Sequence, residues 1–107
     1  MASVRWKAIA AEAELDCTAG ADEVDLATLS GGAGTTPRSV IFSITNRGTA
    51  AAGIRNTATA DGKWAIPIAP GESYETKAIY APMTAGTYVL AGLTGAILDI
   101  LAEVEVV

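Results

Sequence analysis

The sequence predicts an all-β fold: a single antiparallel β-sandwich or jelly-roll-like domain of about seven to eight short strands with an extended N-terminal segment. Two observations predict it. Apolar and polar side chains alternate over several short runs, which is the pattern of strands with one buried face. Each run ends at Gly, Pro, Asn or Asp, the residues that turns require. The runs and turns are spaced as a sandwich requires.

The length and composition suit one domain. The chain has 107 residues, of which 50% are hydrophobic but only 6% aromatic. Small apolar side chains bury little area each, so association with a partner or with further copies would add stability. We expect residues 1–12 to form an N-terminal arm or edge strand and residues 13–107 to form the sandwich domain.

The N-terminal segment has two possible conformations. Up to about Ala8, apolar residues alternate with basic ones, which predicts an extended arm or edge strand, and a second strand is expected around Ala13–Cys17. Residues 8–14 are also good helix formers, so a helix stays an open alternative. The run Arg5, Trp6 and Lys7 is either an arm that binds a partner or an ordinary edge strand. These three residues are the candidate partner-binding residues.

A short apolar stretch around Val24 and Leu26 follows a turn sequence at Thr18–Asp22. The glycine-rich segment Ser30–Pro37 then predicts a flexible loop. The best candidate for a central strand is Arg38–Thr45, because its apolar residues alternate regularly. We expect this strand to end in a turn at Asn46-Arg47-Gly48, since Asn and Gly both tolerate positive φ.

Three further strands are expected, and two turns separate them. Gly53–Asn56 is a weak strand, and Lys63–Ile68 is a strand that lies at an edge or ends there, because Pro67 cannot donate a ladder hydrogen bond. Asp61-Gly62 between them is the strongest hairpin signal in the chain. Pro70-Gly71 predicts a type II turn into a strand at Ser73–Tyr80.

The last part of the chain alternates once more. A strand is expected at Thr87–Ala91, followed by a turn at Gly92–Gly95. From Leu98 onward every second residue is apolar, which favours a strand, although a helical stripe fits part of the segment.

Catalytic chemistry lacks its usual residues. The chain has no histidine, so it has neither a Ser-His-Asp triad nor a histidine-ligated zinc site, and the single cysteine, Cys17, excludes a cysteine zinc site. Cys17 is most simply a small buried hydrophobe. The acidic cluster has the wrong spacing for a calcium loop; its members are Asp16, Asp22, Glu23 and Asp25. We therefore expect no enzyme, no metal and no cofactor.

We also expect neither nucleic acid nor a membrane as a partner. The net charge is −5, and the seven basic residues are scattered, so no patch for nucleic acid forms. No apolar run approaches the ~20 residues of a membrane span, and no signal peptide opens the chain, which predicts a soluble protein made in the cytoplasm. An aromatic group could instead stack on sugars, which keeps a carbohydrate-binding or adhesion module as an alternative; its members are Trp64, Tyr74, Tyr80 and Tyr88.

The central part of the chain resembles small β-sandwich virion proteins of tailed bacteriophages. The similarity lies in a strand that ends in the turn ITNRG (Ile44–Gly48), in the IAPGES turn (Ile68–Ser73) and in a valine-rich last strand. The resemblance covers about two thirds of the chain, from Arg38 onward. It consists of turn chemistry, which is moderately specific.

The resemblance implies a structural function. It points to a capsid decoration or cement protein that binds the major capsid protein on the outer surface of the phage head and bridges neighbouring subunits. It also implies a homo-oligomer, with a trimer favoured, and a virion location after synthesis in the host cytoplasm. A tail or baseplate component of the same fold is an alternative. An acidic module of this kind would bind a basic surface.

Overall fold

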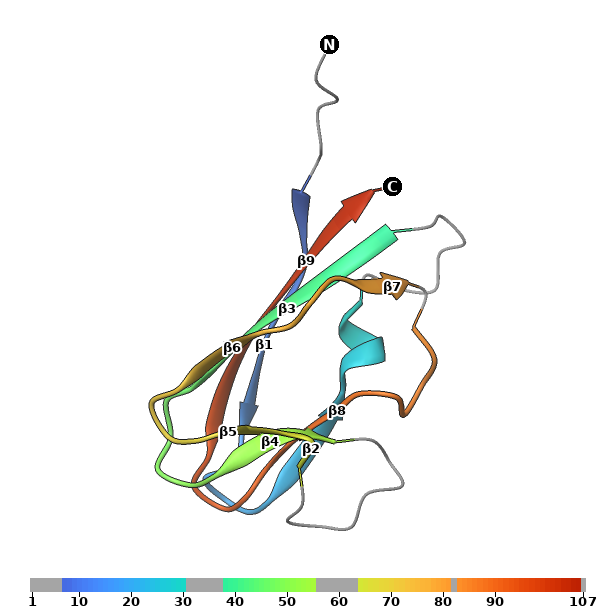
Figure 1. Ribbon diagram of the computed structural model, residues 1–107. Helices are drawn as coiled ribbons and strands as arrows, with labels where there is room; N and C mark the ends of the chain where they lie inside the picture. The colour runs from blue at the N-terminus through green and yellow to red at the C-terminus, as the bar shows by residue number, and fades with distance from the viewer. Residues whose placement is uncertain (1–6, 31–37, 56–63, 82, 107) are drawn as a thin grey trace.

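The computed structural model describes residues 7–30, 38–55, 64–81 and 83–106. These residues form two antiparallel sheets that pack as a sandwich (Figure 1), which confirms the predicted fold class. The described residues contain one short 3₁₀ turn and no α-helix. The elements are β1 (Lys7–Asp16), β2 (Asp22–Asp25), η1 (Leu26–Leu29), β3 (Arg38–Asn46), β4 (Ala52–Arg55), β5 (Ile66–Ile68), β6 (Ser73–Glu75), β7 (Ile79–Ala81), β8 (Val89–Gly92) and β9 (Ile97–Val106).

The two sheets differ in length. The large sheet has the order β1-β9-β3-β6, and β7 also pairs with β3; the small sheet has the order β2-β8-β4-β5. Because β6 and β7 lie along the same partner strand, they form one interrupted edge strand, and each sheet has four strand positions. Three long strands, β1, β9 and β3, make up most of the large sheet, whereas the strands of the small sheet have three or four residues. The large sheet therefore offers the broader outer surface.

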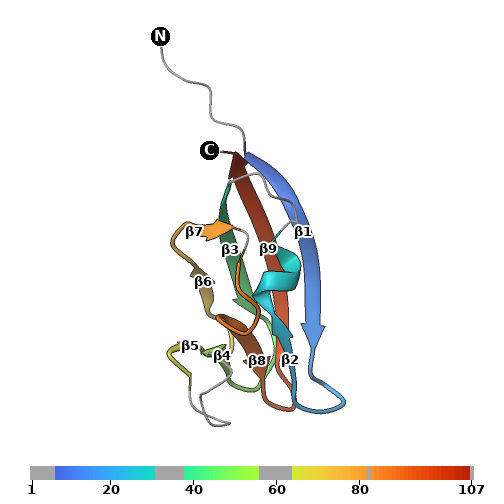
Figure 2. The same cartoon turned by 90° about the vertical axis from the view of Figure 1, so that its right-hand side faces the viewer.

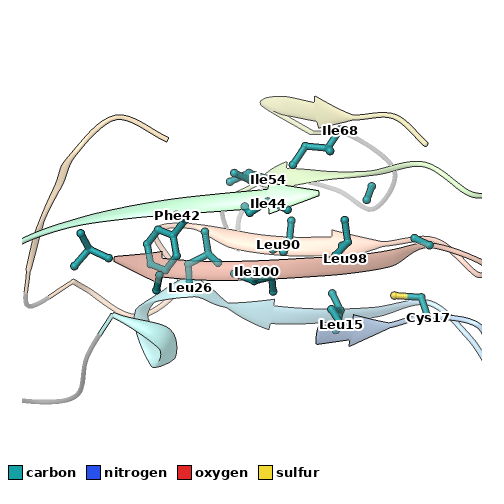
Figure 3. Packing of buried hydrophobic residues seen from close by; sticks show 14 residues of the cluster. Leu15, Cys17, Leu26, Phe42, Ile44, Ile54, Ile68, Leu90, Leu98 and Ile100 are labelled. Carbon is teal, nitrogen blue, oxygen red and sulfur yellow. The ribbon is translucent and has the colours of Figure 1, made fainter. Parts of the chain in front are cut away.

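The core lies between the sheets and follows the predicted alternation. On β3, Val40, Phe42 and Ile44 are buried, and on β9 Leu98 and Ile100 are buried. Figure 3 shows Phe42, Ile44, Leu98 and Ile100 of the large sheet together with side chains of the small sheet in the space between the two layers; the small-sheet members include Ile54, Ile68 and Leu90. Burying such apolar area contributes about 25 cal/mol per Å². Because the C-terminal segment forms β9 and buries Leu98 and Ile100 on one face, the helical alternative for this segment is wrong.

The N-terminal segment is also a strand. β1 runs without a break from Lys7 to Asp16 along β9, so the helical alternative for residues 8–14 is wrong. Its register shifts between Ile9 and Ala11, where one extra residue forms a β-bulge. Figure 2 shows β1 along one side of the molecule. The predicted break between an arm and a strand around Ala13–Cys17 is not observed.

Two turn predictions have different outcomes. Gly71 has a φ of 82°, and the Glu72 N–H donates to the Ala69 carbonyl at 2.9 Å, as a type II turn requires. The turn at Asn46 forms for another reason than the one predicted. Positive φ among the described residues is confined to Gly71, Gly86 and Gly95, and Asn46 is fully buried as the last residue of β3.

The predicted strand at Ser73–Tyr80 is interrupted. Thr76 leaves the ladder between β6 and β7, and its N–H donates to the Phe42 carbonyl at 2.9 Å while its hydroxyl accepts from the Phe42 N–H at 3.0 Å. The hydroxyl thus takes the place of a main-chain carbonyl, which alternation alone does not reveal.

β5 is an edge strand, as Pro67 predicted. The predicted Asp61-Gly62 turn lies outside the described residues, although β4 and β5, which it connects, pair antiparallel. Most of the predicted glycine-rich loop also lies outside them. Its first residue, Ser30, is buried, and its hydroxyl donates to the Ala27 carbonyl at 2.7 Å.

Candidate functional site

The outer face of the large sheet is the broader of the two outer sheet faces, and it is acidic. The register of β1, β9 and β3 places Glu12 beside Leu101 and Ser43, and Ile9 beside Glu103 and Ile41. Ile41 and Leu101 are half-buried, and Ile9 is 61% exposed. Carboxylates surround these apolar side chains; those on β1 and β9 are Glu12, Glu14, Asp16, Asp99, Glu103 and Glu105. We call this surface the acidic face.

One arginine lies within the acidic face. Arg47 donates through Nε to Asp99 Oδ2 at 2.8 Å and through Nη2 to Glu14. All three side chains are about half exposed, so solvent screens the pairs and each adds little stability. The hydrogen bond to Asp99 raises the pKa of Arg47 above its ordinary value. Two carboxylates share one cation here, which leaves the face with a net negative charge.

A shallow hollow of about 450 Å³ opens on the acidic face. It exists because Ser43 and Thr45 are small, while Glu12, Asp99 and Leu101 stand around them. At the C-terminal end of β1, the Thr18 N–H donates to the Asp16 carboxylate at 2.9 Å, and this hydrogen bond lowers the pKa of Asp16. That hydrogen bond favours the ionised form of the carboxylate.

The small sheet carries a second candidate site on its outer side. Trp64 packs closely over Gly53. A Cβ added at Gly53 would lie only 2.6 Å from the Trp64 Cβ. Beside it Arg55 pairs with Glu23, and the Arg55 side chain is only 11% exposed. A hollow of about 370 Å³ lies between them, and Asp22 and Leu93 are among its other lining residues. We call it the Trp64 hollow.

The predicted aromatic group is divided by the fold. Trp64 lines the Trp64 hollow, whereas Tyr74 and Tyr88 line a separate hollow of about 410 Å³ beside Lys77. The side chain of Tyr80 lies outside the described residues. The three aromatic residues whose side chains are described therefore do not share one stacking surface.

The partner-binding candidates are only partly described. Arg5 and Trp6 lie outside the described residues, and Lys7 begins β1 opposite Glu105, with its side chain undescribed. Cys17 is buried, as predicted, and burial raises the pKa of its thiol.

The acidic cluster from the sequence is dispersed over separate interactions. Asp25 accepts from the Ala27 N–H at 3.0 Å and from the Gly86 N–H at 2.7 Å, and Glu23 pairs with Arg55. Within residues 7–30, 38–55, 64–81 and 83–106, no group of three His, Cys, Asp or Glu residues could hold a metal ion. In the same part of the chain, no helix is long and apolar enough to cross a membrane.

The contacts of two residues were not predicted from the sequence: Arg55 beside the Trp64 hollow and the buried Asn46. Arg55 was part of a weak strand, and nothing in its neighbourhood indicated a pair with Glu23, which lies on another strand of the same sheet. For Asn46 the sequence does contain a signal, since this residue continues the inward-facing series of Val40, Phe42 and Ile44. No family model matches the sequence, and no curated protein matches it.

Proposed function

We propose that this chain is a structural virion protein that decorates the head of a tailed bacteriophage and binds the major capsid protein. The observation that carries the proposal is the acidic face, which combines half-buried apolar residues at its centre with carboxylates around them. Interfaces have this arrangement of an apolar centre and a polar rim. The resemblance of residues 38–107 to small virion proteins supports it.

The proposed mechanism is binding alone. The protein needs no catalytic group or cofactor for it, and the role is not enzymatic. Each copy would seat its acidic face on a basic patch of the capsid, and many copies would bridge neighbouring subunits. Local opening of the shell would then break several contacts at once, which stabilises the closed shell by mass action. The protein would be made in the host cytoplasm and remain on the capsid surface.

The test is binding to capsids of the virus that encodes the chain. We expect purified protein to cosediment with mature capsids and to raise the temperature at which they break open. Glu103→Lys reverses a charge between Ile9 and Ile41 on the acidic face and should weaken capsid binding about tenfold or more at low salt. The measurement is the bound fraction across a concentration series.

Glu72→Lys is the matched control, because Glu72 is exposed in the turn before β6 and is not one of the carboxylates of the acidic face. Capsid binding by this variant should remain as in the wild type. Absence of binding to the virus's own capsids would sink the proposal. Antibody labelling of whole virions that marks the tail would favour the tail or baseplate alternative instead.

The Trp64 hollow favours a second candidate function, binding of a carbohydrate. An indole beside a guanidinium and carboxylates can stack on a sugar ring and hydrogen-bond its hydroxyls. If the hollow binds a glycan, Trp64→Ala and Asp22→Asn should both abolish the signal on a glycan array. Tyr88→Ala, in the separate hollow, should leave it unchanged. An array without any hit for the wild type removes this candidate.

A further inference from the structure

β1 is the long edge strand of the sandwich. Natural proteins usually keep edge strands short, interrupt them or place proline in them, which prevents pairing with other chains. Three edges of the described residues follow this rule: β2 has four residues, β5 has three and contains Pro67, and the β6–β7 edge is interrupted at Thr76. β1 has ten residues, and Figure 2 shows it along one side of the molecule. Among the described edges, it offers the most main chain to another strand.

The part of β1 that follows its β-bulge is a regular strand. The register shift lies between Ile9 and Ala11. From Ala11 to Asp16, each residue has one partner on β9, in unbroken order. Bulges are one of the devices that make an edge less suited to pairing, and this one leaves the six residues after it unaffected. We call the segment Ala11–Asp16 the open edge.

A hydrogen bond next to the open edge shows which of its main-chain groups face outward. Successive residues of a strand direct their N–H and C=O groups to opposite sides. The Cys17 N–H donates to the Ala96 carbonyl at 2.8 Å, so Cys17 faces β9. Asp16 then faces away from β9, and by the same alternation Glu14 and Glu12 do so too. The N–H and C=O groups of these three residues therefore point to the free side of β1.

The pairing of β9 leads to the same assignment. The Arg47 N–H of the loop after β3 donates to the Ile97 carbonyl at 2.9 Å, so Ile97 faces β3. The next residue, Leu98, must then face β1, where its partner is Leu15. Leu15 thus faces inward like Cys17, as alternation along β1 requires.

The residues with outward main-chain groups also carry the charges of the open edge. Glu12, Glu14 and Asp16 are exposed on the outer side of the sheet. Ala11 and Ala13 are half-buried on the inner side, at the rim of the core, where they fill little space. On an added antiparallel strand, each residue that exchanges main-chain hydrogen bonds with this edge would lie directly opposite a carboxylate. Main-chain pairing and charge therefore select the same positions of a partner.

We propose that the open edge binds an extended segment of another protein, which adds antiparallel to the large sheet as a further strand. This segment carries lysine or arginine opposite Glu12, Glu14 and Asp16. Apolar residues larger than alanine lie between its basic residues and cover Ala11 and Ala13. In this mode of recognition, main-chain hydrogen bonds supply affinity and alternate side chains supply specificity. The proposal does not depend on what the acidic face binds, because it concerns the edge of the sheet and not its surface.

A second copy of the open edge does not fit this site. In antiparallel pairing, outward-facing residues pair with outward-facing residues, so the carboxylates of one copy would lie opposite those of the other. Like charges directly opposite each other destabilise a sheet. The other described edge strands lack basic residues altogether: β2 reads DEVD, β5 IPI, β6 SYE and β7 IYA. We therefore assign the open edge to a different protein.

The first test uses the full-length chain and a labelled synthetic peptide in which lysine and valine alternate. Fluorescence anisotropy at low salt should show saturable binding below about 1 mM peptide. A peptide of the same composition with its lysines grouped at one end should bind at least about tenfold more weakly. So should a peptide with an N-methyl group on each lysine amide, because methylation removes the main-chain donors and keeps the charge.

Glu12→Pro makes the same test from the protein side. The Glu12 N–H points away from β9, so proline removes no hydrogen bond of the large sheet, and edge strands accept proline at such positions. This variant should abolish peptide binding. Glu12→Gln removes only the charge and should weaken binding about threefold. Glu72→Gln, the same change in the turn before β6, should leave binding as in the wild type.

Hydrogen exchange locates the bound peptide. In the free protein, the amides of Ala13 and Leu15 face β9 and should exchange slowly, whereas those of Glu12 and Glu14 should exchange rapidly. Saturating peptide should slow exchange at Glu12 and Glu14 about tenfold or more. Circular dichroism checks that each variant is folded. If Glu12→Pro does not fold, the N-methylated peptide and the exchange pattern still decide.

Four results would overturn the proposal. The first is no binding of the alternating peptide up to about 1 mM. The second is equal binding of the N-methylated peptide, which would show that charge alone attracts it. The third is protection by the peptide elsewhere than at Glu12 and Glu14. The fourth is a wild type that sediments as a dimer and becomes monomeric with Glu12→Pro, because a second copy would then occupy the open edge.

Discussion

Asn46→Asp is expected to destabilise the protein by about 3–5 kcal/mol at neutral pH. The Asn46 side chain is fully buried and donates through Nδ2 to the Ala50 carbonyl at 2.9 Å and to the Ile68 carbonyl at 3.0 Å. Its Oδ1 accepts from the Gly48 N–H at 3.1 Å. Aspartate has the same shape but no donor, so a buried carboxylate would face two carbonyl oxygens.

The loss should depend on pH in a defined direction. Burial and the two carbonyl oxygens disfavour the ionised form, so the pKa of Asp at position 46 is higher in the folded than in the unfolded chain, where it is about 3.9. The folded state then binds more protons between these two pKa values, and its stability falls as pH rises through that window. The variant should therefore be closest to the wild type in acid and reach its full deficit above the folded-state pKa.

Urea denaturation at a series of pH values measures this effect. Thr45→Ala is the matched control, because Thr45 is exposed and its hydroxyl contacts only the exposed Ser73 hydroxyl at 2.9 Å in the described structure. It should lose less than about 1 kcal/mol, independently of pH. A deficit of Asn46→Asp that stays below about 1 kcal/mol would show that the buried amide does not hold this end of the sandwich together.

Asn46 also shows which part of the fold the sequence can predict. Alternation identified Val40, Phe42 and Ile44 as core residues, because a strand imposes a period of two. The same period places Asn46 inside. A polar residue at such a position must find partners, and these come from Ala50 and from Ile68, which no local pattern identifies.

The candidate surfaces were less predictable than the core. The acidic face depends on the pairing of β1 with β9, which connects residues that are far apart in the sequence. Alternation in the last strand predicts that Glu103 lies opposite the apolar side chains, but it does not show that Glu103 and Glu12 share one face. Arg47 was read as a turn residue, and its position between Glu14 and Asp99 follows only from the fold. Tertiary contacts of this kind carry no local signal.

Gly48→Ala is expected to destabilise the protein by about 3 kcal/mol or more, although the change adds one methyl group. A Cβ at this position would overlap the Gly95 carbonyl oxygen and the Ile97 nitrogen, and it would lie 2.8 Å from the Ala96 carbonyl carbon. These are main-chain atoms, so no side-chain rotation can relieve the overlap. The loop after β3 must therefore move away from the start of β9.

That movement has a cost beyond the overlap itself. The Arg47 N–H donates to the Ile97 carbonyl at 2.9 Å, and the Thr49 N–H donates to the Gly95 carbonyl at 3.0 Å, one on each side of Gly48. Moving the loop stretches both hydrogen bonds. It also displaces Arg47 from Glu14 and Asp99, so these two carboxylates would lose the cation that they share.

Gly20→Ala provides the matched control for the Gly48 substitution. Nothing lies within 4 Å of a Cβ built at Gly20, and neither glycine has positive φ, so the two changes differ only in the space available. Gly20→Ala should be neutral or stabilise by up to about 1 kcal/mol, because alanine reduces the entropy of the unfolded chain. Chemical denaturation of both variants measures the difference. Equal stabilities would mean that the loop yields freely, whereas the expected gap shows that close main-chain approach, and not positive φ, requires glycine after Asn46-Arg47.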